Sequence, residues 1–297
     1  MSPTQTLKFS WWNSSLSPPI KRTENEYDKH RKVAVEVIYK LLNEKEIDFL
    51  ALGEVSADDV TFFKQLKELE NYEIVTGVVK SGRVNFDTCF IYHQDKVRIH
   101  SEVIVIDTAR GDQKIKIAQK IILEIINEKE PFYLFVSHWK SRLHCSKSDA
   151  DRHLLGMRLR DEVDDIYKNF GKDAPLILLG DYNDEPFDDP LSEQLMATRD
   201  KALILKKEFL LYNPFWQYLS YQNPDYAGTY YYKSGSITQW HTFDQIIVSS
   251  VFIIGNKWLL DEKETGIVYF SDYLKQVKNG KTIFDHLPVM TTLKKGV

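Results

Sequence analysis

The sequence predicts a sheet-rich α/β sandwich that forms a single domain over residues 1–297. The predicted interior strands are apolar at consecutive positions, so that both faces of a sheet need cover. Helical patterns alternate with these strands and can supply that cover. No Pro-, Gly- or Ser-rich linker divides the chain, and candidate functional residues come from both halves. The hydrophobic share of 43% is sufficient for a substantial core.

The first predicted strand covers residues 7–13 and leads through a Ser/Pro loop to a predicted helix over residues 27–45. In this helix Val33, Val37 and Leu41 recur every four residues, which places them on one face. Neighbouring apolar positions widen the same face: Ala34, Ile38 and Leu42. The helix is therefore expected to pack against a sheet.

Further elements follow in alternation along the chain. Two more helices are predicted over residues 58–69 and 149–167. Apolar runs predict the remaining strands, at residues 47–55, 72–79, 88–92, 99–106, 115–125, 132–137, 176–179, 228–232, 243–249, 266–270 and 289–293. The run at residues 115–125 also fits a helix.

Composition narrows the class of protein. With 39 Lys and Arg against 43 Asp and Glu, the formal net charge is -4, which argues against a polybasic nucleic-acid binder. A local basic groove stays possible on such a protein. No segment approaches the ~18 consecutive apolar residues of a membrane span, and residues 1–9 lack an export signal, so we expect a cytoplasmic protein. Cys89 and Cys145 fit reduced thiols rather than a disulfide.

Polar residues suited to phosphate chemistry follow the predicted strand at residues 176–179. The chain continues there as Gly-Asp-Tyr-Asn-Asp-Glu-Pro, which contains Asp181 and Asn183. Because Gly, Asp and Asn are common turn formers, a simple turn is the alternative interpretation. In the functional interpretation, Asp181 holds a nucleophilic water and Asn183 donates a hydrogen bond to a phosphate oxygen.

A second candidate group, Asp285 and His286, precedes the last predicted strand. A histidine suits general base chemistry near neutral pH, whereas a hydrogen-bonded surface pair is the alternative. Asp244 stands at the start of the strand predicted over residues 243–249. It could fix the tautomer of His286 or cap its own strand.

His138 closes the strand predicted at residues 132–137, and Lys140 and Arg142 follow it. A protonated His138 could serve as an acid or stabilise an oxyanion, and the two cations could bind the phosphates of a substrate. A loop histidine with solvated cations is the alternative. Asp87 could orient His138 or cap a strand, and we do not count it among the candidate site residues.

Glu54 indicates a metal site. It ends the apolar run at residues 47–55, where a buried carboxylate without a partner would be costly. A hard divalent cation with oxygen ligands, Mg²⁺ or Mn²⁺, is a suitable partner. Asn13, at the end of the first strand, could add an amide oxygen, although an Asn before two serines is also typical of a turn.

Taken in order, these residues resemble the motifs of the endonuclease/exonuclease/phosphatase superfamily, which includes deoxyribonuclease I. The resemblance extends over nearly the whole chain. It implies a four-layer sandwich of two mixed β-sheets flanked by helices, with the active site at one end of the sheets. By position it assigns the metal site to Asn13, Glu54 and Asp285, and the catalytic groups to His138, Asp181, Asn183, Asp244 and His286. Lys140 and Arg142 are the candidates for substrate binding.

Within the superfamily, residues 138–141 and 180–186 resemble the bacterial nuclease branch. Inositol-polyphosphate phosphatases typically carry Asn followed closely by Arg and later Pro-x-Trp-x-Asp-Arg, whereas this chain has Asp184 and Asp244-Gln245. Gly53 also stands where the family usually has Gln before the metal-site Glu.

We therefore expect a phosphodiester hydrolase that depends on Mg²⁺ or Mn²⁺, with nucleic acid, DNA or RNA, as its substrate. A phosphomonoesterase or sphingomyelinase-like phospholipid hydrolase of the same fold is one alternative. A catalytically inactive binding module is another, and its expected signature is the loss of a metal-site residue or histidine. None is lost here.

Overall fold

The computed structural model describes residues 5–17, 23–220, 223–255 and 257–296, and two large β-sheets dominate it. The first sheet has the strand order β17-β18-β1-β2-β6-β3. Its strands are β1 (Thr6–Asn13), β2 (Phe49–Gly53), β3 (Glu73–Thr76), β6 (Cys89–Tyr92), β17 (Trp258–Ile267) and β18 (Val289–Lys295). Because β1 pairs parallel with β2 and antiparallel with β18, this sheet is mixed.

The second sheet has the order β12-β13-β16-β11-β10-β9-β7, and β8 also pairs with β9. Its strands are β7 (Val97–Ile99), β8 (Ile104–Arg110), β9 (Gln113–Ile125), β10 (Phe132–His138), β11 (Leu176–Asp181), β12 (Ala197–Thr198), β13 (Leu211–Tyr212) and β16 (Asp244–Ser249). Two small hairpins lie outside these sheets: β4 (Val79–Ser81) with β5 (Val84–Phe86), and β14 (Tyr230–Tyr231) with β15 (Trp240–His241).

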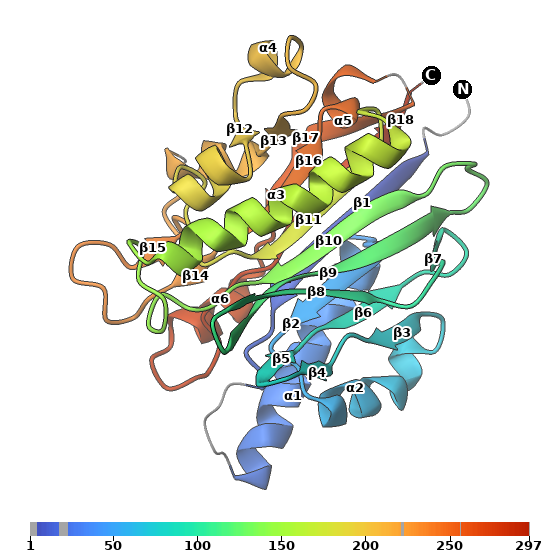
Figure 1. Cartoon of the computed structure of the whole chain (residues 1–297). Coiled ribbons are helices and arrows are strands. Elements are labelled where there is room, and N and C mark those ends of the chain that lie inside the picture. Colours follow the sequence, from blue (N-terminus) through green and yellow to red (C-terminus); the bar gives the residue numbers. More distant parts are fainter. Residues whose placement is uncertain (1–4, 18–22, 221–222, 256, 297) are drawn as a thin grey trace.

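Helices cover the outer faces of the two sheets (Figure 1). The α-helices are α1 (Glu24–Tyr39), α2 (Ala57–Lys64), α3 (Ala150–Phe170), α4 (Lys201–Ile204), α5 (Val251–Ile254) and α6 (Ser271–Lys278). Helices α1, α2 and α6 pack on the first sheet, and α3 packs on the second. Within the described ranges, no helix is both long and apolar enough to cross a bilayer.

Alternation of side chains along the strands explains the layers. Phe9 and Trp11 of β1 lie in the core between the sheets, whereas Trp12 packs toward the helices. In β11, Ile177 joins the core between the sheets and Leu178 packs under α3. The apolar strands are thus covered on both faces, as a buried mixed sheet requires. The predicted four-layer arrangement is confirmed.

Several element boundaries differ from the sequence predictions. The segment at residues 115–125 lies within strand β9 and not in a helix. Its buried isoleucines and leucine recur every second residue, at 115 and 117 in the core under α3 and at 121, 123 and 125 in the core between the sheets. The strand predicted over residues 99–106 is divided between β7 and β8. The strand predicted over residues 266–270 is mostly wrong: β17 ends at Ile267, and α6 begins at Ser271. Polar residues along β17 hide its period-2 pattern.

Candidate active site

Strand register brings three predicted site residues into one row at one end of the second sheet. His138 ends β10 and pairs with Asp181 at the end of β11. Asp181 in turn pairs with Asp244 at the start of the antiparallel strand β16. Because these strands are neighbours, a histidine and two carboxylates that are far apart in sequence become adjacent at the sheet edge.

The first sheet contributes residues at the same end. Asn13 closes β1, and its amide nitrogen donates to Glu54 Oε1 at 3.1 Å and to Asp181 Oδ2 at 3.3 Å. Glu54 directly follows β2 and adopts a left-handed backbone conformation, with φ of 52°. Such a conformation is uncommon for a residue with a Cβ and recurs at functional sites. Asn13 therefore joins the ends of the two sheets.

His286 is held in place by Asp244. Its Nδ1 lies 2.7 Å from Asp244 Oδ2, and the indole N–H of Trp11 donates to Asp244 Oδ1 at 2.8 Å. With Nδ1 bound to a carboxylate, Nε2 is the ring nitrogen left to face the cavity, 3.8 Å from Asp181 Oδ2. Asp244 thus orients the ring of His286.

A second Asp–His pair orients His138. Its Nδ1 lies 3.0 Å from Asp87 Oδ2, and Lys116 Nζ donates to Asp87 Oδ1 at 2.8 Å. His138 Nε2 lies 4.0 Å from Asp181 Oδ2 and 3.8 Å from Glu54 Oε1. Two carboxylate-bound imidazoles therefore converge on Asp181. Sequence reasoning left Asp87 out of the site because a strand cap fitted it equally well.

These groups surround a cavity of about 380 Å³. Its lining consists of Ser15, Glu54, His138, Ser141, Leu143, Asp181, Asn183, Tyr230, Lys233, Thr282, Ile283, Asp285 and His286. Asn13 and Asp244 act behind this surface, through the hydrogen bonds given above.

Charge in this cavity is unbalanced. Burial raises the pKa of Glu54, Asp181 and Asp285, and the nearby histidines only partly offset it. Burial lowers the pKa of His286, but Asp244 and Asp181 outweigh it, so that its pKa lies well above the ordinary value. For His138, Asp87 likewise outweighs burial and raises the pKa. Three carboxyl groups that resist ionisation indicate a place where added positive charge would be stabilising.

The oxygen-rich donor set fits a divalent cation. Glu54 and Asp285 line the same cavity, and the charge of Asp285 contributes to the raised pKa of Glu54. Asp181, Asp244 and His286 form a group whose donor atoms lie within 4.8 Å of one another. In that group, however, Asp244 is already bound to His286 and Trp11. Glu54 and Asp285 could therefore hold a divalent cation such as Mg²⁺ or Mn²⁺.

Asn183 is fixed at the cavity wall. Its backbone is left-handed, with φ of 52°, and its N–H donates to Asp181 Oδ1 at 2.8 Å. Its side-chain amide donates to the carbonyl of Trp139 at 3.1 Å. This local turn places Asn183 beside Asp181.

The two predicted substrate-binding cations do not line the cavity. Lys140 Nζ lies 3.9 Å from Asp151 Oδ2, and the Arg142 guanidinium is paired with Asp184 and Asp188. Lys233 is the basic residue in the lining, and its amino group donates to the carbonyl of Thr282 at 2.9 Å. No recognisable sequence motif surrounds Lys233, so sequence reasoning missed it.

Tyr230 was also missed. Its ring centroid lies 4.7 Å from that of His286, and the two residues form an isolated β-bridge. Burial and the neighbouring carboxylates Asp285, Asp181 and Glu54 raise its pKa, so that the phenol stays protonated. In the structure, Tyr230 lines the cavity that contains the candidate site residues.

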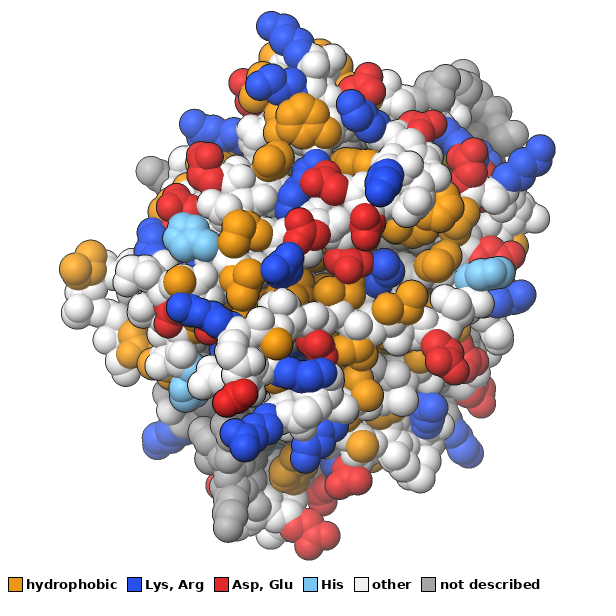
Figure 2. All heavy atoms as spheres, in the orientation of Figure 1, with side chains coloured by type: hydrophobic (Ala, Val, Ile, Leu, Met, Phe, Trp, Pro, Cys, Tyr) orange, Lys and Arg blue, Asp and Glu red, His pale blue; other side chains and the backbone are white. Residues whose placement is uncertain are grey.

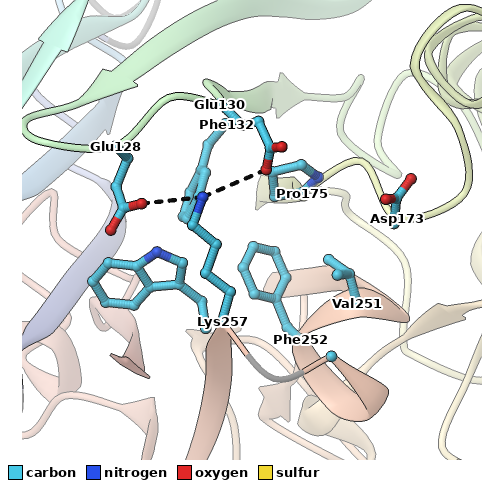
Figure 3. Close-up of a pocket in the computed structure, with 10 residues that line it drawn as sticks. Glu128, Glu130, Phe132, Asp173, Pro175, Val251, Phe252 and Lys257 are labelled. Atoms are coloured by element: carbon cyan, nitrogen blue, oxygen red, sulfur yellow. Dashed lines mark hydrogen bonds and ion pairs between the residues drawn. The ribbon is translucent and has the colours of Figure 1, made fainter. Parts of the chain in front are cut away.

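A second cavity, of about 260 Å³, lies at the opposite end of the sheets, near the start of β10. Figure 3 shows the amino group of Lys257 between Glu128 and Glu130, at 3.1 and 3.5 Å. Lys295 also pairs with Glu128 at 2.7 Å. Burial favours the neutral form of Glu128, but the two lysines outweigh it and lower its pKa. Glu128 and Glu130 are thus paired with lysines, whereas Glu54, Asp181 and Asp285 lie near histidines.

We expect Glu128→Gln to lower the free energy of unfolding at pH 7 by at most about 1 kcal/mol, because the lysines are partly exposed. A lowered pKa stabilises the fold above the ordinary Glu value of about 4.3, and the effect is lost as pH falls through the folded value. Urea unfolding from pH 7 to pH 3 measures this, with exposed Glu70→Gln as control. The expectation would be contradicted if the wild-type protein exceeded Glu128→Gln in free energy of unfolding by the same amount at pH 7 and at pH 3.

A model of the Endonuclease/Exonuclease/phosphatase family matches residues 17–293. An endonuclease/exonuclease/phosphatase family protein from Bacteroides thetaiotaomicron has a similar structure, with a TM-score of 0.65 at 16% identity, over 99% of this chain and 96% of that chain. A comparison with curated protein sequences gives no significant match.

Two further structures show the same fold. A mannosyl-6-phosphatase from Bacteroides thetaiotaomicron matches with a TM-score of 0.61 at 16% identity, over 97% of this chain and 99% of that chain. D. rerio TDP2, complexed with single strand DNA product, matches with a TM-score of 0.53 at 19% identity, over 97% and 98% of the two chains. Identities this low establish shared architecture only.

Proposed function

The chain belongs to the Endonuclease/Exonuclease/phosphatase family and is a phosphoesterase of that superfamily, and we propose that it hydrolyses phosphodiesters of nucleic acid with Mg²⁺ or Mn²⁺. The observation that supports this most strongly is the convergence of two Asp-bound histidines on Asp181, in a cavity that Glu54 and Asp285 also line. The resemblance of residues 138–141 and 180–186 to the bacterial nuclease branch supports nucleic acid as the substrate class.

In the proposed reaction, Asp181 accepts the proton of the attacking water as its oxygen bonds to phosphorus. Protonated His286, held by Asp244, donates Nε2–H to a phosphate oxygen and stabilises its charge. As the ester P–O bond breaks, His138 gives its Nε2 proton to the leaving oxygen. Asn183 and Tyr230 hold the phosphate in the cavity as hydrogen-bond donors. A divalent cation held by Glu54 and Asp285 would neutralise negative charge on the phosphate.

A second candidate function is that of a phosphomonoesterase. It is favoured because the basic side chains near His138 are paired with carboxylates of the protein. Lys140 and Arg142 pair with Asp151, Asp184 and Asp188. Lys and Arg side chains are interspersed with Asp and Glu on the face shown in Figure 2. A long nucleic acid needs many free cations along its backbone, whereas a small phosphate monoester needs only those in the cavity. A mannosyl-6-phosphatase shares this architecture.

A substrate panel distinguishes the candidates. Purified protein would be incubated with plasmid DNA, RNA, phosphoinositide, sphingomyelin and p-nitrophenyl phosphate, first with Mg²⁺ or Mn²⁺ and then with EDTA. Cleavage of DNA or RNA that EDTA abolishes is the expected result. Hydrolysis of p-nitrophenyl phosphate alone would favour the phosphomonoesterase. If the folded, cation-supplied protein hydrolysed none of them, both proposals would be wrong and the binding module would be favoured.

A further inference from the structure

Two arginines connect the loops that follow β10 and β11. The first loop, residues 139–149, follows His138, and the second, residues 182–189, contains Asn183. We infer that Arg142 and Arg152 are positioning residues, which lock these loops together and so fix His138 and Asn183 relative to Asp181. This role replaces the substrate contact predicted for Arg142, and it rests on the proposed phosphoesterase function.

Arg152 lies in the first turn of α3 and is fully buried. Its guanidinium donates to the carbonyls of Lys140 and Cys145 in the first loop. It also donates to the carbonyl of Tyr182 at 3.2 Å and pairs with Asp184 Oδ2 at 3.5 Å in the second loop. One side chain therefore binds the backbone of both loops at once.

Arg142 makes the same connection from the first loop. Its Nε donates to the carbonyl of Asn183 at 2.8 Å. Its Nη2 pairs with Asp188 and lies 3.5 Å from Asp184 Oδ1, and the guanidinium stacks 4.5 Å from the centroid of the Phe243 ring. Arg142 thus holds the carbonyl of a residue whose backbone conformation is left-handed and whose neighbour is Asp181.

Only arginine suits these two places. Its planar group offers five N–H donors in a fixed fork, whereas lysine offers a single flexible ammonium. The carbonyls and the two aspartates need donors in several directions at once. Burial raises the pKa of Asp184 to about 7 even though Arg152 and Arg142 lower it. The charges of Arg152, Arg142 and Lys147 thus favour the ionised form of this carboxylate, whereas burial favours the neutral form.

Lys147 provides a matched control. It also pairs with Asp188, and it lies 5.0 Å from the centroid of the Phe187 ring. Its side chain is 59% exposed, against 27% for Arg142. Lys147→Ala therefore removes one cation from the same aspartate while leaving the Arg142 bond to Asn183 in place.

The kinetic test compares Arg142→Ala, Arg152→Lys and Lys147→Ala on the substrate that wild-type protein hydrolyses. We expect Arg142→Ala to lower kcat by about 10- to 100-fold, the scale of losing an orienting partner, with KM changed less than about twofold. Added guanidinium should partly restore kcat. Arg152→Lys should lower kcat similarly, and Lys147→Ala should change neither constant. A raised KM with unchanged kcat in Arg142→Ala would instead show a substrate contact and overturn the inference.

A second readout does not depend on activity. Backbone hydrogen exchange at residues 139–145 and 182–188 should accelerate at least about tenfold in Arg142→Ala, because these loops lose their connection. Exchange in Lys147→Ala should match that of wild-type protein. Unchanged exchange in Arg142→Ala would overturn the inference even if no substrate were cleaved. Absence of wild-type hydrolysis together with faster exchange would contradict the proposed function alone.

Discussion

Replacing His286 with alanine is expected to lower kcat by about 100-fold or more, the scale of general acid–base catalysis. The expectation rests on geometry: Asp244 binds Nδ1 at 2.7 Å, and Nε2 lies 3.8 Å from Asp181 in the cavity. Alanine removes the imidazole and leaves the Asp244 and Asp181 charges without their histidine partner. Steady-state kinetics on the substrate identified by the panel measures the effect.

His241 offers a matched control for this variant. It too binds a carboxylate through Nδ1, at 2.9 Å from Glu185 Oε1, but it does not line the cavity. His241→Ala should keep kcat within about threefold of the wild-type value, because no reacting group is lost. A folded His286→Ala protein, verified by circular dichroism, that retained full kcat would remove His286 from the mechanism.

Glu54→Gln is expected to lower kcat by about 100-fold and to raise the Mg²⁺ concentration needed for half-maximal activity. A bound metal ion contributes several kcal/mol of charge stabilisation, and each 1.36 kcal/mol changes a rate about tenfold. Glutamine keeps the shape of the side chain but removes its charge. Titration of activity with Mg²⁺ and Mn²⁺ measures both effects.

Thermal unfolding gives a separate readout for Glu54. A cation that binds only the folded state raises Tm, so Mg²⁺ should stabilise the wild-type protein and have little effect on Glu54→Gln. Because burial raises the pKa of Glu54, the variant without cation should be at least as stable as wild type. Glu130→Gln, in the second cavity, should respond to Mg²⁺ as wild type does. An equal Mg²⁺ response in Glu54→Gln would exclude Glu54 as a ligand.

Most of the cavity could be anticipated from strand ends. Glu54, His138 and Asp181 each follow an apolar run in the sequence, and register places His138 opposite Asp181. Asp285 and His286 precede β18, whose β1 neighbour ends at Asn13. A polar residue at the end of an apolar run is a local feature of the sequence, so it can be recognised without the structure. The catalytic and metal roles of these residues stay predictions.

Other parts of the site depended on contacts between distant segments. Lys140 and Arg142 looked free for substrate beside His138, but their acidic partners lie in α3 and in the loop after β11. Tyr230 and Lys233 lie in or beside a two-residue strand that has no periodic pattern. Charge pairing and cavity lining could not be anticipated for them from neighbouring residues.

Periodicity in the chain was enough to specify alternating helices and strands, and hence the layered sandwich, because burial of a strand or helix face is encoded over a few residues. The depth of each carboxylate, the partner of each cation and the orientation of both histidines required the folded molecule. Electrostatic energies depend on the distance between charges and on the exclusion of water. In this protein, both the distances and the burial are set by segments that lie tens to hundreds of residues apart in the sequence. The hydrogen bond from Trp11 to Asp244 is one example.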